Sequence, residues 1–155
     1  MKFLCDDNLG KLARYLRMLG HDTFYKSSLT DPELLATMLA ERRFVITRDH
    51  NLAGRLELGR FLLIDTDSPE EQLKAVITDL KLEIDKAELF SRCLECNEVC
   101  VDVSPDDIKD EVFPYVIKTH DQFRRCPACG RIYWQGSHYE DMLEKLEKII
   151  GLEDV

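Results

Sequence analysis

Short apolar runs alternate with helix-like segments along the first 80 or so residues. The runs at 3–5, 23–25, 44–47 and 61–64 have the length and composition of strands. Leucines at helical spacing predict helices between them, which begin near Leu9, at Asp31, near Asn51 and at Ser68. Because strands that alternate with helices form parallel sheets covered by helices, the pattern predicts an α/β fold.

Residues at the predicted helix ends support these assignments. Asp31 precedes Pro32, which is typical of an N-cap followed by proline in the first turn. Ser68 precedes a proline and two glutamates, which is typical of a capping box. Gly20 follows the leucine-rich stretch and is expected to end that helix.

The pattern changes from about Ser91 onward. Short β-like pieces at 99–103 and 131–134 surround two Cys-x-x-Cys pairs, and a last helix is expected from about Tyr139 to Ile150. We therefore predict two domains, an α/β domain over 1–88 and a small metal-binding module with a C-terminal helix over 89–155.

The two cysteine pairs predict one zinc ion. Two Cys-x-x-Cys turns supply four thiolates in tetrahedral geometry, which leaves no open position, so the zinc is expected to be structural. The alternative is two unrelated reduced pairs. Cys5, in the first apolar run, is expected to be a buried strand residue. The predicted ligands are Cys93, Cys96, Cys126 and Cys129.

Charge and hydropathy limit the class of protein. The formal net charge of -9 argues against a protein that coats nucleic acid without specificity. It is compatible with an enzyme whose carboxylates hold cations against a phosphate. No apolar run approaches the roughly 20 residues that a membrane span needs. The acidic pair Asp6–Asp7 comes too early in the chain for a signal peptide. We therefore expect no membrane association and a cytoplasmic location.

Aspartates follow three of the four predicted strands, as Asp6, Asp49 and Asp65, and Asp31 begins a helix. Ligands of parallel sheets bind at the carboxyl ends of the strands. Clustered carboxylates suit Mg²⁺ or Mn²⁺, ions that activate water and bind phosphate oxygens. Each aspartate also has a local alternative: Asp31 and Asp49 as helix caps, and Asp65 as a turn residue.

Basic residues lie close to this acidic centre. Lys11, Arg14 and Arg17 recur on the polar side of the first helix, and Arg48 precedes Asp49. They either contact the phosphates of a ligand or form a solvated helix face. Basic and aromatic residues at 124–134 either bind single-stranded nucleic acid or pack in the metal-binding module.

Several segments together resemble a known family. Residues 3–6 and 9–22 resemble the opening motif of the PIN-like RNase family named after the C-terminal domain of the mut-seven exonuclease. Asp31 before a leucine-rich helix and the run Ile46–Asp49 resemble its next two motifs. Residues 92–97 and 126–138 resemble its zinc ribbon, so the resemblance covers nearly the whole chain.

The resemblance implies a PIN-like nuclease domain fused to a zinc ribbon. Such a protein would hydrolyse RNA with Mg²⁺ or Mn²⁺ held by acidic residues. Carried over by motif, these are Asp6, Asp31 and Asp49, with Asp65 as a further candidate. Two alternatives remain open: a non-catalytic RNA-binding or ribosome-associated module, and a zinc-ribbon adaptor for another protein in which the aspartates serve as caps.

Overall fold

The computed structural model describes residues 1–151 and divides into two compact units, which meet in sequence between Asn97 and Glu98. The domain boundary predicted from the sequence, between residues 88 and 89, lies slightly earlier than this division. It remains a prediction about which segments fold independently. Its second domain also includes residues 152–155, which lie outside the described part of the chain.

The first unit contains the predicted parallel sheet, in the order β2-β1-β3-β4. All four predicted strands are present, which confirms the α/β fold class. None of the helices within residues 1–151 is both long and apolar enough to cross a membrane. The strands are β1 (Phe3–Cys5), β2 (Thr23–Phe24), β3 (Phe44–Thr47) and β4 (Phe61–Leu63); the helices are α1 (Gly10–Met18), α2 (Asp31–Glu41), α3 (His50–Ala53), α4 (Pro69–Leu80) and a 3₁₀ turn at Lys86–Glu88.

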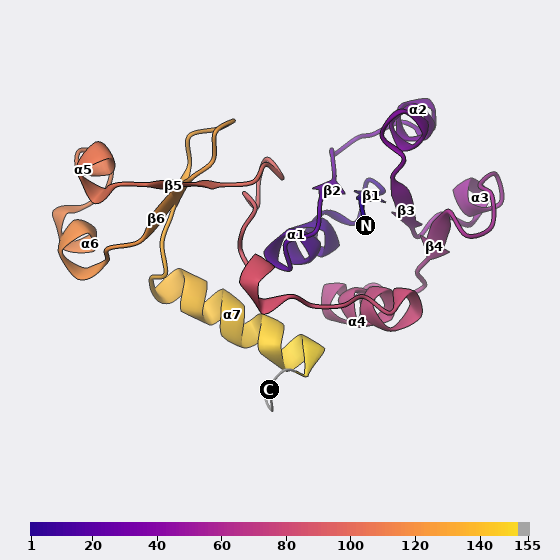
Figure 1. Ribbon diagram of the computed structural model, residues 1–155. Helices are drawn as coiled ribbons and strands as arrows, with labels where there is room; N and C mark the ends of the chain where they lie inside the picture. The colour runs from indigo at the N-terminus through magenta and orange to yellow at the C-terminus, as the bar shows by residue number, and fades with distance from the viewer. Residues whose placement is uncertain (152–155) are drawn as a thin grey trace. The chain divides into compact units, whose positions relative to one another are not determined.

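Helices cover both faces of this sheet (Figure 1). Leu4 and Val45 are paired in register and join Leu34 and Met38 of α2 in one core cluster, which Leu52 of α3 completes. The helices α1 and α4 pack against each other in a second layer. Because successive strand residues point to opposite faces, short strands without charged residues contribute buried side chains to both layers.

The cap of α2 differs from the prediction. Thr30, not Asp31, is the N-cap: its hydroxyl accepts from the Glu33 amide, and the Glu33 carboxylate accepts from the Thr30 amide. Thr30 has the extended backbone that a cap requires, whereas Asp31 already lies in the first turn. Asp31 is therefore available for other contacts.

The cap of α4 is confirmed in part. The Ser68 hydroxyl accepts from the Glu71 amide, as predicted. The reciprocal bond of a capping box is not part of this cap: the Ser68 amide donates to the Thr66 hydroxyl instead. Helix α1 ends as predicted before Gly20, whose φ of +87° is in the left-handed region that favours glycine.

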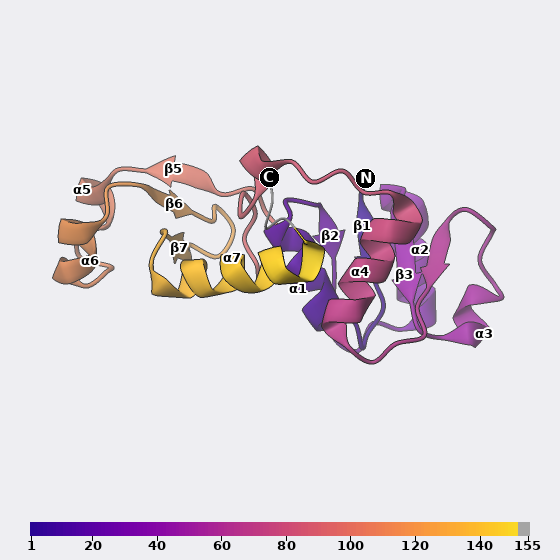
Figure 2. The same cartoon turned by 90° about the horizontal axis from the view of Figure 1, so that it is seen from below.

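The second unit is an antiparallel sheet in the order β5-β6-β7, followed by a long helix. Two short helices connect β5 to β6 and lie side by side in both views (Figures 1 and 2). The sequence pattern predicted β5, β7 and α7, and did not predict the other elements. The bounds are β5 (Val101–Val103), α5 (Pro105–Ile108), α6 (Pro114–Thr119), β6 (Phe123–Arg125), β7 (Ile132–Tyr133) and α7 (Ser137–Ile150).

Candidate functional site

Three aspartates follow adjacent strands of the first unit. Asp6 comes directly after β1, Asp49 two residues after β3, and Asp65 two residues after β4. Since these strands are neighbours and parallel, their carboxyl ends lie along one edge of the sheet. This edge is where an open α/β sheet binds its ligands.

Thr47, the last residue of β3, connects Asp6 to Asp49. Its hydroxyl lies 2.7 Å from Oδ2 of Asp6, to which it donates, and accepts from the Asp49 amide at 3.0 Å. The Thr47 side chain is fully buried. The Asp7 amide donates to the other oxygen of Asp6 at 2.8 Å, so the Asp6 carboxylate is held in one orientation. Thr47 is not among the site residues predicted from the sequence, although its position at the end of an apolar run is visible there.

Asp49 is the N-cap of α3, which confirms its local alternative. Its Oδ1 accepts from the amides of Asn51 and Leu52 at 2.8 and 3.2 Å. Capping uses one carboxylate oxygen, and the same arrangement turns the carboxylate toward the start of the helix. Capping and metal binding through the second oxygen are therefore compatible.

The remaining acidic residues at this edge have basic partners. Asp31 pairs with Arg55 at 3.1 Å, and Asp65 with Nε2 of His50 at 3.0 Å. Arg48 pairs with Asp67. Among residues 1–151, no three acidic side chains bring ligand atoms within 4.8 Å of one another. The topology thus brings the strand-end aspartates to one edge, although no three of their carboxylates form a tight cluster in the described residues.

The three basic residues of α1 lie in different environments and do not form one continuous exposed stripe. Lys11 is exposed, and Arg14 forms an ion pair with Glu95 at 2.6 Å. Arg17 is only 6% exposed. Its guanidinium donates to the backbone oxygens of Thr23, Leu94 and Glu95 at 3.0, 2.8 and 3.2 Å. Arg17 therefore fastens the first Cys-x-x-Cys turn to α1 and β2.

Two more side chains hold the same turn in place. Asn97 accepts from the Thr23 amide at 2.8 Å and donates to the Asp22 carboxylate at 2.7 Å. Arg92 donates to the backbone oxygens of Gly20 and Asn97 at 3.0 and 2.8 Å. The first cysteine pair is thus packed onto the α/β unit by side-chain hydrogen bonds.

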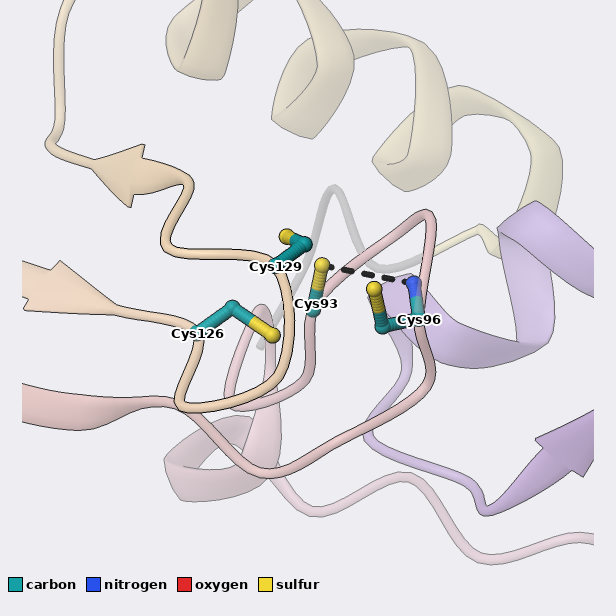
Figure 3. Close-up of side chains that lie close together, drawn as sticks. All are labelled: Cys93, Cys96, Cys126 and Cys129. Atoms are coloured by element: carbon teal, nitrogen blue, oxygen red, sulfur yellow. Dashed lines mark hydrogen bonds between the residues drawn. The ribbon is translucent and has the colours of Figure 1, made fainter.

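The two Cys-x-x-Cys turns have matching backbones. The backbone amide of Asn97 donates to the backbone oxygen of Cys93, and that of Gly130 to the backbone oxygen of Cys126, both at 2.9 Å. The φ angles of Asn97 and Gly130 are +69° and +77°. The sulfur atoms of all four cysteines lie within 4.8 Å of one another (Figure 3). Two such turns with clustered thiolates can hold a zinc ion, as the spacing predicted.

The other residues considered in the sequence have packing or surface positions. The rings of Trp134 and Phe123 lie 6.3 Å apart, and Arg124 and Arg125 pair with Asp102 and Glu111. These contacts favour the packing interpretation of the basic and aromatic residues at 124–134. Cys5 is fully buried as predicted, and burial raises the pKa of its thiol to about 12.

Comparison with known proteins assigns the family. The Mut7-C RNAse domain matches residues 1–146. The chain is 33% identical over 101 residues to a human protein described as "Exonuclease mut-7 homolog", a match that spans 62% of this chain and 12% of that protein. Among solved structures, none matches the chain. The chain belongs to the Mut7-C RNAse domain family, a family of nucleases.

Proposed function

We propose that this chain is a metal-dependent ribonuclease that hydrolyses RNA phosphodiester bonds at the carboxyl edge of the sheet β2-β1-β3-β4. The observation that carries the proposal is the link from Asp6 through Thr47 to Asp49 at adjacent strand ends, in a chain of the Mut7-C RNAse family. A buried hydroxyl that orients a carboxylate is typical of a site whose ligands are held ready for binding.

Carboxylate oxygens fit a hard divalent cation such as Mg²⁺ or Mn²⁺. Asp6 and Asp49 are the proposed ligands, with Asp31 and Asp65 as further candidates once Arg55 and His50 exchange their partners. When bound, such an ion activates water and stabilises negative charge on the phosphate. The chain's own contribution is to hold the Asp6 and Asp49 carboxylates in fixed orientations.

RNA is the proposed substrate, and basic side chains near this edge would contact its phosphates. Lys11, Arg14 and Arg48 remain candidates, because they are exposed or only partly buried and their ion pairs can be exchanged. Arg17 was predicted with them, but its three bonds to backbone oxygens support a structural role instead. We further propose that a structural zinc ion occupies the four-cysteine cluster.

A non-catalytic RNA-binding module is the second candidate. It is favoured by the basic partners of Asp31 and Asp65 and by the capping role of Asp49, since these contacts stabilise the aspartates without a metal ion. The two candidates differ in whether the carboxyl edge binds a divalent ion and cleaves RNA.

Two measurements on the full chain distinguish them. Mn²⁺ binding is measured by calorimetry without RNA, and cleavage of a single-stranded RNA is measured with Mn²⁺. Asp6→Asn and Asp49→Asn each remove a ligand charge with little change of shape, so each should abolish cleavage and weaken Mn²⁺ binding by tenfold or more, about 1.4 kcal/mol. Asp7→Asn is the matched control, because the Asp7 side chain accepts a backbone bond from Ser28 outside the proposed site.

The outcomes separate the candidates. If Asp6→Asn and Asp49→Asn cleave as well as the parent, the proposed active site is wrong. If the parent binds RNA but neither binds Mn²⁺ nor cleaves, the non-catalytic module is correct.

A further inference from the structure

The connection between β5 and β6 exposes two aromatic rings that are separated by one residue in sequence. Phe113 is 81% exposed and Tyr115 is 73% exposed, on either side of Pro114 at the start of α6. Phe113 is the N-cap of α6 and makes no capping bond through its side chain. Ser, Thr, Asp or Asn would stabilise the helix start better. Local structure therefore does not account for a phenylalanine at this position.

The same connection has a net negative charge. From Ser104 to Asp121, both included, the chain has five acidic residues and two lysines. Asp106 and Asp107 lie in the first turn of α5, and Asp110 and Glu111 lie between the two helices; all four are exposed. Of the arginines of β6, Arg125 pairs with Glu111 and so offsets one of these carboxylates, whereas Arg124 pairs with Asp102 outside the connection.

We propose that this acidic aromatic surface, formed by Asp106, Asp107, Asp110, Phe113 and Tyr115, docks a basic segment of a partner protein that also presents apolar side chains. Exposed aromatic residues supply most of the binding free energy at protein interfaces when an apolar partner surface covers them. The surrounding carboxylates select a partner rich in Lys and Arg and speed its association.

The charge of the surface excludes RNA as the favoured occupant. Aromatic side chains that stack on RNA bases lie in positively charged grooves that follow the phosphates. Here Asp106, Asp107 and Asp110 outnumber the exposed Lys109 and Lys118, so the net charge around the rings is negative and disfavours a polyanion. The docking surface is therefore separate in chemistry from the proposed nuclease site, and neither proposal depends on the other.

Pro114 adds a second reason to expect docking. It fixes φ at the first helical position of α6 and limits the conformations of the segment that presents both rings. A segment that is ordered before binding loses less conformational entropy on association. The rings are thus presented in a geometry that a partner can recognise.

Fluorescence anisotropy with the full chain tests the proposal. The probe is a labelled peptide of alternating Arg and Leu, and its controls have Gln for Arg or Ser for Leu. The parent should bind the Arg-Leu peptide in a salt-dependent way and bind both control peptides more weakly. The double variant Phe113→Ser/Tyr115→Ser and the triple variant Asp106→Asn/Asp107→Asn/Asp110→Asn should each lose about tenfold or more in affinity.

The test also includes a control variant and two alternative ligands of the surface. Leu58→Ser removes another apolar side chain, one that is 92% exposed, and should bind like the parent. Circular dichroism and metal content verify that each variant is folded. Equal peptide affinity in all variants would overturn the proposal. If the parent binds labelled oligouridylate and the aromatic double variant does not, the surface binds RNA. If the parent forms a concentration-dependent dimer and this variant does not, the surface binds a second copy of the chain.

Discussion

The hydroxyl of Thr47 lies 2.7 Å from the carboxylate of Asp6, although the two residues are 41 positions apart in sequence. The contact exists because β1 and β3 are paired in parallel, with Cys5 in register with Ile46. The residues that follow these two partners therefore meet at the carboxyl edge of the sheet. The same hydroxyl accepts from the Asp49 amide, so one buried side chain orients both proposed metal ligands.

We predict that Thr47→Val impairs the proposed metal site more than Thr47→Ser. Valine keeps the volume but leaves the Asp6 oxygen and the Asp49 amide without this partner, which should lower the free energy of unfolding by about 1–3 kcal/mol. Serine keeps both hydrogen bonds and loses one buried methyl group, about 0.8 kcal/mol. Urea unfolding in EDTA measures the stability, and calorimetry measures the Mn²⁺ affinity. Similar Mn²⁺ affinities for the two variants would show that the hydroxyl does not orient the ligands.

Local pattern was sufficient to predict the sheet of the first unit. The predicted runs at 3–5, 44–47 and 61–64 have no charged residue, and each has a charged residue directly before it and directly after it. Such runs are long enough for a strand and too short for a helix of ordinary length. The aspartates at their ends could be located for the same reason, because a strand end is a property of the local sequence.

Elements that depend on distant partners were not predicted. The strand β6, Phe123–Arg125, contains two arginines and forms because β5 and β7 pair with it on both sides. Helices α5 and α6 are too short to show a helical period. The burial of Arg17 depends on Leu94, 77 residues away, whose backbone oxygen replaces water as the partner of the guanidinium.

We predict that Arg17 stabilises the fold and that Lys11 does not. Arg17→Met removes the donors for three backbone oxygens and should lower the free energy of unfolding by about 2–3 kcal/mol. Arg17→Lys keeps the charge but not the planar arrangement of donors, and should recover only part of this loss. Lys11→Ala should change stability by less than about 0.5 kcal/mol.

Salt dependence of RNA binding distinguishes the two roles. If Lys11 contacts a phosphate, Lys11→Ala should reduce the slope of log affinity against log salt by about 0.7. Arg17→Met should leave that slope unchanged at temperatures where it is folded. A stable Arg17→Met protein with a reduced salt slope would instead restore Arg17 to the phosphate-binding stripe.

Asp22 is predicted to make stability depend on acidic pH. Partial burial raises the pKa of Asp22, but hydrogen bonds from Arg43 and Asn97 outweigh this effect and hold the pKa below its usual value. A carboxyl group with a lower pKa in the folded state stabilises the fold at pH values above its unfolded pKa of about 3.9. This contribution is lost as the pH falls through the folded pKa.

The matched variant for this prediction is Asp22→Asn, which keeps the shape and one acceptor. The parent should be more stable than Asp22→Asn at neutral pH, and the difference should shrink as the pH falls below about 4. Urea unfolding of both proteins at several pH values between neutrality and pH 3 or so measures this difference and cancels the titration of groups that they share. A difference that is independent of pH would show that folding does not lower the pKa of Asp22.

We predict one zinc ion per chain, and loss of that zinc in Cys126→Ser. Structural zinc contributes about 10 kcal/mol or more to the folding of small zinc modules, so the variant should lose structure around the second Cys-x-x-Cys turn. The sheet β2-β1-β3-β4 should stay folded, because Arg17, Arg92 and Asn97 hold the first turn by bonds that do not involve sulfur.

The control for this prediction is Cys100→Ser. Cys100 is 9% exposed but lies outside the four-cysteine cluster, so this variant should keep its zinc. Elemental analysis of protein purified without chelator gives the zinc content, and hydrogen exchange locates the lost structure. Absence of zinc from the parent would refute the assignment, and exchange that spreads through β1 and β3 in Cys126→Ser would show that the zinc also supports the proposed nuclease site.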